Sequence, residues 1–162
     1  MRVVVTGAAG LIGGAVCAEL IRQDMDVIGV DKRRTSIDHV LPELRALTTD
    51  SLEDLWVGVD AVVHLAGIPS PGVVSDDDLF LNNTVSSYRV FQSAARSGVR
   101  RLLLASSISI YGLVWGSARP TLPRLPLGAD TDLHITDTYA LTKQVDEASA
   151  AMASKRYGIP SI

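Results

Sequence analysis

The chain has 162 residues, enough for one domain with a sizeable core. Its 15 lysines and arginines and 18 aspartates and glutamates give a formal net charge of −3, which offers no electrostatic case for binding nucleic acid or an acidic membrane. No apolar run approaches the length of a membrane span. The only cysteine, Cys17, cannot form an internal disulfide, so we expect a small buried side chain and a reduced, cytoplasmic setting.

The first fourteen residues predict a strand, a glycine turn and a helix. Val3–Val5 is a β-branched run that suits a strand buried on both faces. Gly7, Gly10 and Gly13 follow at three-residue spacing. An apolar stripe then keeps a helical period at Leu11, Ile12, Ala15, Val16 and Leu20. This order is typical of dinucleotide sites, where N–H groups at the helix start face the pyrophosphate. The spacing differs from the common G-x-G-x-x-G, and a tight turn needs glycine for steric reasons alone, so the loop by itself is a weak signal.

A second strand is predicted over Val27–Asp31. Asp31 ends it, 18 residues after Gly13, where a carboxylate can accept hydrogen bonds from the adenosine ribose. A carboxylate there repels a 2′-phosphate and favours NAD. Arg33 and Arg34 follow closely and offer the alternative of binding that phosphate, which leaves NADP open.

The next segment is polar and poorly periodic. Residues 32–46 predict a connection or short helix, followed by a short strand near Arg45–Thr49. Asp50-Ser51-Leu52-Glu53 has the character of a capping box, so a helix is expected to begin at Asp50 or Ser51. Because Asp50 would follow the third strand, it is equally a candidate for contact with the adenine edge.

Ala61–Gly67 predicts an apolar strand that enters a glycine turn, with His64 as a packed side chain rather than a ligand or base. A long helix is expected over 76–97, and the three aspartates at its start complement the helix dipole without a metal site. We expect the sheet-facing side chains of this helix to be Leu81, Val85, Tyr88 and Phe91. Asn82 and Asn83 are unusual inside such a helix and favour a functional interpretation.

Arg101–Ser107 predicts the next strand, and Ser161-Ile162 the start of another. The stretch Leu113–Thr138 looks irregular, and loops this long are often binding loops or lids. Trp115 and Arg119 are candidate substrate contacts within it.

The final helix is predicted over Thr138–Tyr157, with Tyr139 and Lys143 one turn apart on one face. A free phenol has a pKa of about 10, and a neighbouring ammonium together with a nicotinamide cation favours its anion. Tyr139 is therefore a candidate to remove a hydroxyl proton while hydride leaves the same carbon. A surface helix with an exposed tyrosine and lysine is the usual explanation of such a pair. The pair gains weight from its position after a strand that ends in serines.

Taken together, the elements predict an α/β fold, a Rossmann-like, doubly wound parallel sheet with helices on both faces. Ligand should lie at the carboxyl ends of the strands, where the glycine loop, Asp31, Ser107 and the start of the last helix gather.

The chain resembles the extended short-chain dehydrogenase/reductase family, in its NAD-dependent epimerase/dehydratase group. The matching segments, in the family's order along almost the whole chain, are Thr6–Gly13, Asp31, Asp50, His64–Gly67, Asn83, Ser106-Ser107 with Tyr111-Gly112, and Tyr139–Lys143. The departures are Ser86-Ser87 in place of Gly-Thr, Thr142 in place of the commoner serine, and no Asp-Glu in Leu127–Asp130. The loop His64–Pro69 and the proline-rich insert within Leu113–Thr138 suggest a branch near the uronate dehydrogenases.

The resemblance implies a catalytic triad of Ser107, Tyr139 and Lys143, with Ser107 positioning the substrate oxygen and Lys143 also binding the nicotinamide ribose. It implies NAD, with NADP less favoured, and no metal. The cofactor-binding residues that we predict are Gly7, Ala9, Gly10, Leu11, Ile12, Gly13, Asp31, Lys32, Asp50, Ser51, Leu65, Ala66, Gly67, Asn83, Ala105, Tyr139 and Lys143.

The resemblance further implies an NAD(P)-dependent oxidoreductase, epimerase or dehydratase acting on a sugar, sugar acid or nucleotide-sugar. The alternative is a non-catalytic module that senses NAD(P) or binds a partner. Family members usually continue well beyond this length, so we expect residues 1–162 to be the cofactor-binding part, with the C-terminal strands and the substrate domain missing. The helices at 76–97 and 138–157 would form the contact of a homodimer.

Overall fold

The protein is described by a computed structural model, which covers residues 1–33, 38–40, 44–115 and 125–162. Its centre is a parallel sheet of five strands in the order β3-β2-β1-β4-β5. The strands are β1 (Arg2–Thr6), β2 (Asp26–Asp31), β3 (Asp38–Val40), β4 (Ala61–His64) and β5 (Arg101–Leu104). An isolated parallel bridge between Leu102 and Ser161 begins to extend the sheet beyond β5. The predicted α/β parallel sheet is confirmed.

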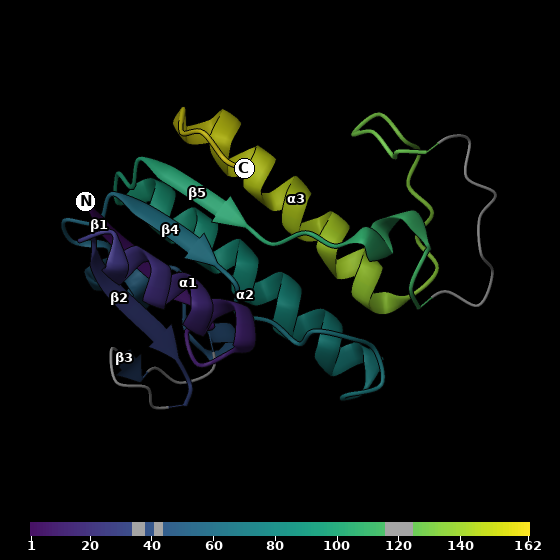
Figure 1. Cartoon of the computed structure of the whole chain (residues 1–162), viewed down its shortest axis with the longest axis horizontal. Helices are drawn as coiled ribbons and strands as arrows, with labels where there is room; N and C mark the ends of the chain where they lie inside the picture. Colours follow the sequence, from purple (N-terminus) through teal and green to yellow (C-terminus); the bar gives the residue numbers. More distant parts are fainter. Residues whose placement is uncertain (34–37, 41–43, 116–124) are drawn as a thin grey trace.

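Three long helices cover the two faces of the sheet (Figure 1). Helix α1 (Leu11–Arg22) lies on one face, and α2 (Asp76–Arg96) and α3 (Thr138–Tyr157) pack together on the other. The short 3₁₀ helices are η1 (Leu44–Ala46), η2 (Asp50–Trp56) and η3 (Ile108–Tyr111). Among the residues that the structure describes, no helix is both long and apolar enough to cross a membrane.

The valines of β1 are buried on both faces, as their run predicts. Val3 and Val5 belong to a small cluster with Cys17 of α1. Val4 points the other way, into a larger cluster with Phe91 of α2 and residues of α3 and η2. The period of two along the strand thus divides the core into two parts with β1 between them.

The two long predicted helices are confirmed almost to the residue because each has a side-chain cap. The Ser75 hydroxyl accepts from the Asp78 N–H at 3.1 Å, and the Asp137 carboxylate accepts from the Ala140 N–H at 2.8 Å. Gly158 ends α3 in the left-handed conformation, with φ of +70°. Local sequence signals therefore decide the bounds of both elements.

The strand predicted near Arg45–Thr49 is wrong. The third strand lies earlier, at Asp38–Val40, and pairs only with β2. Leu44 and Leu47 instead pack against the larger core cluster from a 3₁₀ turn. The segment after β3 therefore follows the burial of these two leucines rather than forming a strand. Strand β3 itself was hard to predict, because three residues at a sheet edge carry little sequence signal.

A helix begins at Asp50, as predicted, in the form of the 3₁₀ helix η2, but the capping box predicted at Asp50-Ser51 is wrong. The N-cap of η2 is Thr49, with no side-chain cap bond among the described residues. Thr48 and Ser51 instead exchange hydrogen bonds, from the Thr48 N–H to Ser51 Oγ at 2.9 Å and from the Ser51 N–H to Thr48 Oγ1 at 3.1 Å. The reciprocal pair exists, but it begins two residues earlier than predicted.

Two helix faces differ from those that their apolar residues predict. Leu11 and Ile12 of α1 are 93% and 62% exposed, because they stand at the helix start beyond the edge of the sheet. On α2, Leu81 and Tyr88 are 51% and 45% exposed, although Phe91 is buried as expected. The buried face of α2 instead includes Asn83, Thr84, Ser86 and Ser87. These small polar side chains allow α2 to pack closely against its neighbours.

Candidate active site

The glycine turn is shaped first by packing. Gly7 has φ of +74°, and a Cβ there would lie 2.7 Å from the Ala66 nitrogen. A Cβ on Gly13 would overlap the Gly7 carbonyl oxygen, so no larger residue fits where α1 approaches β1. Gly10 closes the turn by donating its N–H to the Gly7 carbonyl oxygen at 2.9 Å. The steric explanation of the glycines therefore holds at Gly7 and Gly13, and it places backbone N–H groups at the edge of the sheet.

The start of α1 is open to a ligand. Gly10 is its N-cap and supplies no side chain, so within the described residues no side-chain acceptor caps the first turn. That turn carries no acidic residue, and it displays Leu11 and Ile12 on the surface. A helix start concentrates partial positive charge and unpaired N–H groups, which together suit an anion.

Asp31 is mostly buried and ties two loops together. One carboxylate oxygen accepts the Ala9 N–H at 3.0 Å, and the other accepts the Arg33 N–H at 2.9 Å. The Arg33 guanidinium lies 3.5 Å from Asp31 and donates to the Ala9 carbonyl at 2.8 Å. Each carboxylate oxygen keeps further lone-pair capacity. Arg34, the other arginine considered for a 2′-phosphate, lies outside the described residues.

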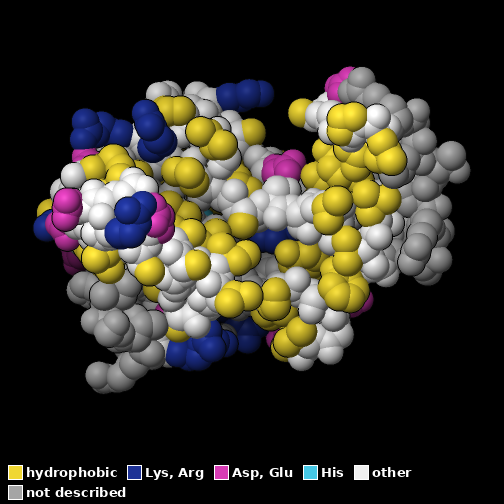
Figure 2. All heavy atoms as spheres, in the orientation of Figure 1, with side chains coloured by type: hydrophobic (Ala, Val, Ile, Leu, Met, Phe, Trp, Pro, Cys, Tyr) yellow, Lys and Arg dark blue, Asp and Glu magenta, His cyan; other side chains and the backbone are white. Residues whose placement is uncertain are grey.

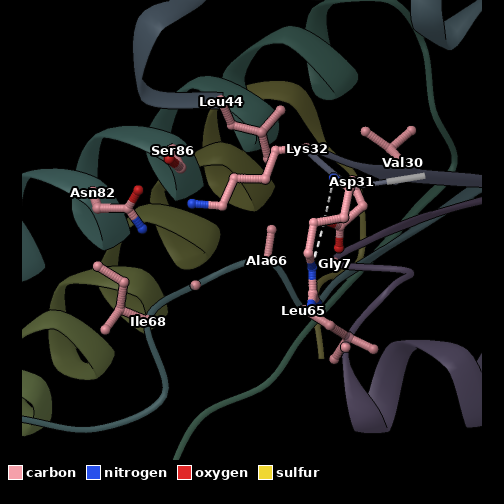
Figure 3. A pocket seen from close by; sticks show the side chains of 13 residues that line it. Gly7, Val30, Asp31, Lys32, Leu44, Leu65, Ala66, Ile68, Asn82 and Ser86 are labelled. Atoms are coloured by element: carbon pink, nitrogen blue, oxygen red, sulfur yellow. Dashed lines mark hydrogen bonds and ion pairs between the residues drawn. The ribbon is translucent and has the colours of Figure 1, made fainter. Parts of the chain in front are cut away.

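A cavity that is open to solvent lies between the glycine turn and α2. Figure 3 shows the Lys32 side chain extending across it toward Asn82 and Ser86. The wall is formed by Gly7, Gly10, Val30, Asp31, Lys32, Arg33, Leu44, Leu65, Ala66, Gly67, Ile68, Asn82 and Ser86. Seven of these are predicted cofactor-binding residues, namely Gly7, Gly10, Asp31, Lys32, Leu65, Ala66 and Gly67.

Other predicted cofactor residues stand outside this wall, as far as the structure describes it. Asp50 is exposed and forms an ion pair with Arg96 of α2 at 2.9 Å. Ser51 is engaged with Thr48, and the Ala105 N–H donates to the His64 carbonyl at 3.4 Å. Contact between these three residues and the cofactor stays a prediction.

Asn83 connects the cavity to the start of α3. Its amide oxygen accepts the Ile68 N–H at 2.8 Å, and its amide nitrogen donates to the Ile68 carbonyl at 3.0 Å. The same nitrogen donates to Thr142 Oγ1 at 3.3 Å. The side chain is buried, so in this structure it holds the loop after β4 against the turn that carries Tyr139 and Lys143. Its direct contact with a cofactor stays a prediction.

The three predicted catalytic residues come from two neighbouring elements that pack together, η3 and α3. Ser107 is the N-cap of η3, where its Oγ accepts the Ser109 N–H at 3.1 Å. Tyr139 is partly buried near the start of α3. The Lys143 Nζ lies 5.8 Å from the centre of the Tyr139 ring. Figure 2 shows this face of the molecule hollowed between the sheet and the part that carries η3.

Lys143 is held by a carboxylate that the sequence did not single out. Its Nζ lies 3.2 Å from Asp146 Oδ2, and the two side chains are only 12% and 3% exposed. Burial raises the pKa of the Asp146 carboxyl, while the Lys143 charge opposes that rise. Within the described ranges, no group of three or more His, Cys, Asp or Glu side chains is arranged to hold a metal ion.

Sequence reasoning missed several residues of the site. Leu44 in the cavity wall is apolar and carries no chemical signal. Ser86 stands one helical turn after Asn82 on α2, so helical spacing from that unusual asparagine was the signal that would have found it. Of the candidate substrate contacts, Trp115 is half exposed, and Arg119 lies outside the described residues.

The geometry now described agrees with comparisons to known proteins. The profile of the NAD dependent epimerase/dehydratase family matches residues 3–162. The chain belongs to this family. The family resemblance drawn from the sequence is therefore confirmed, and NAD is the cofactor after which the family is named.

Similar proteins include enzymes of sugar and nucleotide-sugar chemistry. The chain is 31% identical to L-arabinose 1-dehydrogenase (NAD(P)(+)) of Haloferax volcanii, over 98% of this chain and 63% of that protein. It is 28% identical to the uncharacterized UDP-glucose epimerase YtcB of Bacillus subtilis, over 100% of this chain and 54% of that protein. A short-chain dehydrogenase/reductase superfamily protein of Agrobacterium tumefaciens, solved with bound NAD, superposes with a TM-score of 0.84 at 30% identity, over 100% of this chain and 48% of that one. This chain thus spans about half the length of such relatives.

Proposed function

We propose that the protein acts as an NAD-dependent oxidoreductase, epimerase or dehydratase on a sugar, sugar acid or nucleotide-sugar. The observation that carries the proposal is the bridge made by Asn83. One end of its amide holds Ile68 in the wall of the cavity, and the other end holds Thr142, between Tyr139 and Lys143. The cavity and the tyrosine–lysine pair are thereby fixed to the same edge of the sheet.

The described residues fit NAD. The uncapped start of α1 suits the pyrophosphate, and the absence of a side chain at Gly10 leaves room for a phosphate to approach the backbone. Asp31 keeps acceptor capacity for the ribose hydroxyls, and its charge opposes a 2′-phosphate. Arg33 is already engaged with Asp31 and Ala9, which favours NAD over NADP.

In the proposed reaction, bound NAD would supply a hydride acceptor. Tyr139 would take the proton from a substrate hydroxyl, with the Lys143 ammonium 5.8 Å from the centre of its ring. Lys143 would also orient the nicotinamide ribose. Ser107, at the start of η3, would hold the substrate oxygen.

We also propose that the protein forms a homodimer through the outer faces of α2 and α3. Leu81 and Tyr88 lie seven residues apart on α2 and are both exposed. Leu141 and Met152 do the same on α3, eleven residues apart. Both spacings return to one face of a helix, so each helix presents an apolar stripe to solvent.

The proposed function is tested by binding and turnover in sequence. NADH and NADPH are titrated while nicotinamide fluorescence is followed, and we expect NADH to bind more tightly. L-Arabinose, glucuronate, UDP-glucose and UDP-galactose are then incubated with NAD, with NADH absorbance and chromatography of the sugar as the readouts. Chromatography is needed because an epimerase returns its hydride and shows no net reduction.

The matched control uses two tyrosines of the same helix. Tyr139→Phe should abolish turnover and leave NADH binding within a few fold. Tyr157→Phe should preserve turnover, because the Tyr157 hydroxyl lies 3.4 Å from Gln92, away from the described cavity. Binding without turnover of any sugar would favour the non-catalytic module, and no binding of either dinucleotide would overturn the proposal.

A further inference from the structure

A chain of buried polar groups leads from the glycine turn to Lys143, and it begins at Thr6. The Thr6 Oγ1 accepts the N–H groups of Leu65 and Ala66, both at 3.2 Å. A hydroxyl oxygen has two acceptor sites and one proton. With both acceptor sites used, the Thr6 proton is directed to His64 Nδ1, which lies 2.8 Å away.

This contact fixes the state of His64. Burial lowers the pKa of the imidazole to about 3, with the charge of Lys143 adding to the effect, so the ring is neutral near pH 7. Because Nδ1 accepts from Thr6, the ring proton is on Nε2. His64 Nε2 then donates to Ser87 Oγ at 3.0 Å. The Ser87 hydroxyl keeps its own proton available for a further acceptor.

Asp146 of α3 is the ionisable group on which this chain acts. Burial raises the pKa of the Asp146 carboxyl, and the Lys143 ammonium and the Ser87 hydroxyl oppose that rise. Oδ2 accepts from Lys143, whereas Oδ1 is buried and has no hydrogen-bond partner among the described residues. Apart from Lys143, the described charge that acts on Asp146 is Glu147 of the same helix, which is bonded to Ser106 near the surface.

We propose that Asp146 is a positioning residue of the active site: its buried carboxylate holds the Lys143 ammonium beside Tyr139 and balances part of its charge. The placement of Asp146 beside Lys143 is shown by the 3.2 Å contact between their nearly buried side chains. The hydrogen-bonded chain Thr6–His64–Ser87 supports it. Its catalytic meaning rests on the proposed function. At its other end, the chain Thr6–His64–Ser87 holds Leu65 and Ala66, which form part of the cavity wall.

The consequence concerns the hold on Lys143. Asp146→Asn keeps the shape of the side chain but removes its negative charge, so the Lys143 ammonium loses its charged partner. Asp146→Glu keeps the charge.

The proposal is tested by the exchange of the Lys143 ammonium protons with water, followed by proton–nitrogen NMR in the full chain without cofactor. In Asp146→Asn we expect this exchange to be at least tenfold faster than in the parent protein, because the ammonium loses its buried charged partner. Glu147→Gln is the matched control and should change the exchange by less than threefold. An unchanged rate in Asp146→Asn, or an equal change in Glu147→Gln, overturns the proposal.

A second measurement uses the unmodified protein, in case Asp146→Asn does not fold. Proton–nitrogen NMR of lysine ammonium groups reports how fast each one exchanges with water. We expect the Lys143 ammonium to exchange at least tenfold more slowly than that of Lys155, which is exposed on the same helix. Equal exchange would show that Asp146 does not hold the lysine. Neither measurement uses NAD or a sugar. A negative result would therefore overturn the role of Asp146 without bearing on the proposed function.

Discussion

Two adjacent glycines of α1 are alike in sequence and differ entirely in what surrounds them. A Cβ on Gly13 would overlap the backbone of Gly7, which has no rotamer with which to move away. A Cβ on Gly14 would meet the Ala8 carbonyl at 3.6 Å, an ordinary contact distance. Alanine is favoured over glycine within a helix by about 1 kcal/mol. The same substitution therefore has opposite expected effects at the two positions.

We expect Gly13→Ala to lower the free energy of unfolding by about 2 kcal/mol or more, the scale of overpacking in a rigid core. It should also weaken NADH binding, because the turn must shift away from α1. Gly14→Ala should raise the free energy of unfolding by about 0.5–1 kcal/mol. Urea denaturation of the three proteins measures both effects. Similar destabilisation of the two variants would contradict the close contact assigned to Gly13.

His64 gives stability a dependence on pH. Its pKa falls from about 6.5 in the unfolded chain to about 3 in the fold, because burial penalises the charged ring. Between these values the unfolded chain binds the proton and the folded chain does not, so stability is lost as the pH falls from about 6.5 toward 3. The raised pKa of Asp146 acts in the opposite sense, since its contribution is lost as the pH rises above 3.8.

Replacing His64 by glutamine should isolate the histidine contribution. A glutamine side chain cannot gain the proton, so the free energy of unfolding of His64→Gln should fall less steeply between pH 6 and pH 4, by about 2.5 kcal/mol over the interval at most. At pH 7 the variant should be less stable than the parent, because the hydrogen bond from Thr6 is disturbed. Urea denaturation at a series of pH values gives both results. Parallel curves for the two proteins would show that His64 does not titrate as described.

At the scale of elements, α2 is organised by hydrogen bonds as much as by apolar packing. Its buried face carries Asn83, which bonds the loop after β4 and the first turns of α3 together. Next to it, Asn82 lines the cavity and donates to the Asn83 amide oxygen at 3.0 Å. Asn83 thus anchors the loop after β4, whereas Asn82 forms part of the cavity wall.

We expect Asn83→Ala to lower the free energy of unfolding by about 2–3 kcal/mol, because it leaves the Ile68 backbone groups without their partner. NADH affinity should fall with it, since the loop borders the cavity. Asn82→Ala removes only the hydrogen bond from Asn82 to the Asn83 amide oxygen, so it should lower the free energy of unfolding by less than about 1 kcal/mol. Thermal unfolding and NADH titration of the pair measure this difference. Equal effects would mean that Asn83 is not the anchor.

How far the sequence could predict these elements depends on where their signals lie. Helices α2 and α3 were predictable because Ser75 and Asp137 cap them locally, and β1 because its valines are buried on both faces. Strand β3 was not, because three residues at a sheet edge carry almost no pattern. The glycine turn and Asp31 follow from spacing, whereas Asp146 is one acidic residue on a polar helix until the fold sets it beside Lys143.

At the scale of the whole molecule, the parallel sheet brings the ends of four strands to one edge. Gly7 follows β1, Asp31 ends β2, Leu65 follows β4 and Ala105 follows β5. The order β3-β2-β1-β4-β5 reverses direction between β1 and β4, which is where such folds bind their ligand. The cavity lies at this point, so the topology and the glycine turn agree on the position of the cofactor.

The opposite side of the α2–α3 layer carries the proposed dimer contact. If the exposed stripes of the two helices bury each other across a two-fold axis, one subunit supplies Leu81 and Tyr88 and receives Leu141 and Met152, and the second subunit does the same.

Sedimentation equilibrium of the protein at tens of micromolar should then give twice the mass of one chain. Leu81→Lys combined with Tyr88→Lys should give a single chain, because two desolvated charges at an apolar contact cost several kcal/mol per interface. Val57→Lys is the control, since Val57 is more exposed than Leu81 and Tyr88 and belongs to neither helix, as the residue that ends η2. A parent protein that sediments as a single chain would contradict the dimer, and a dimer that survives the double substitution would place the contact on another face.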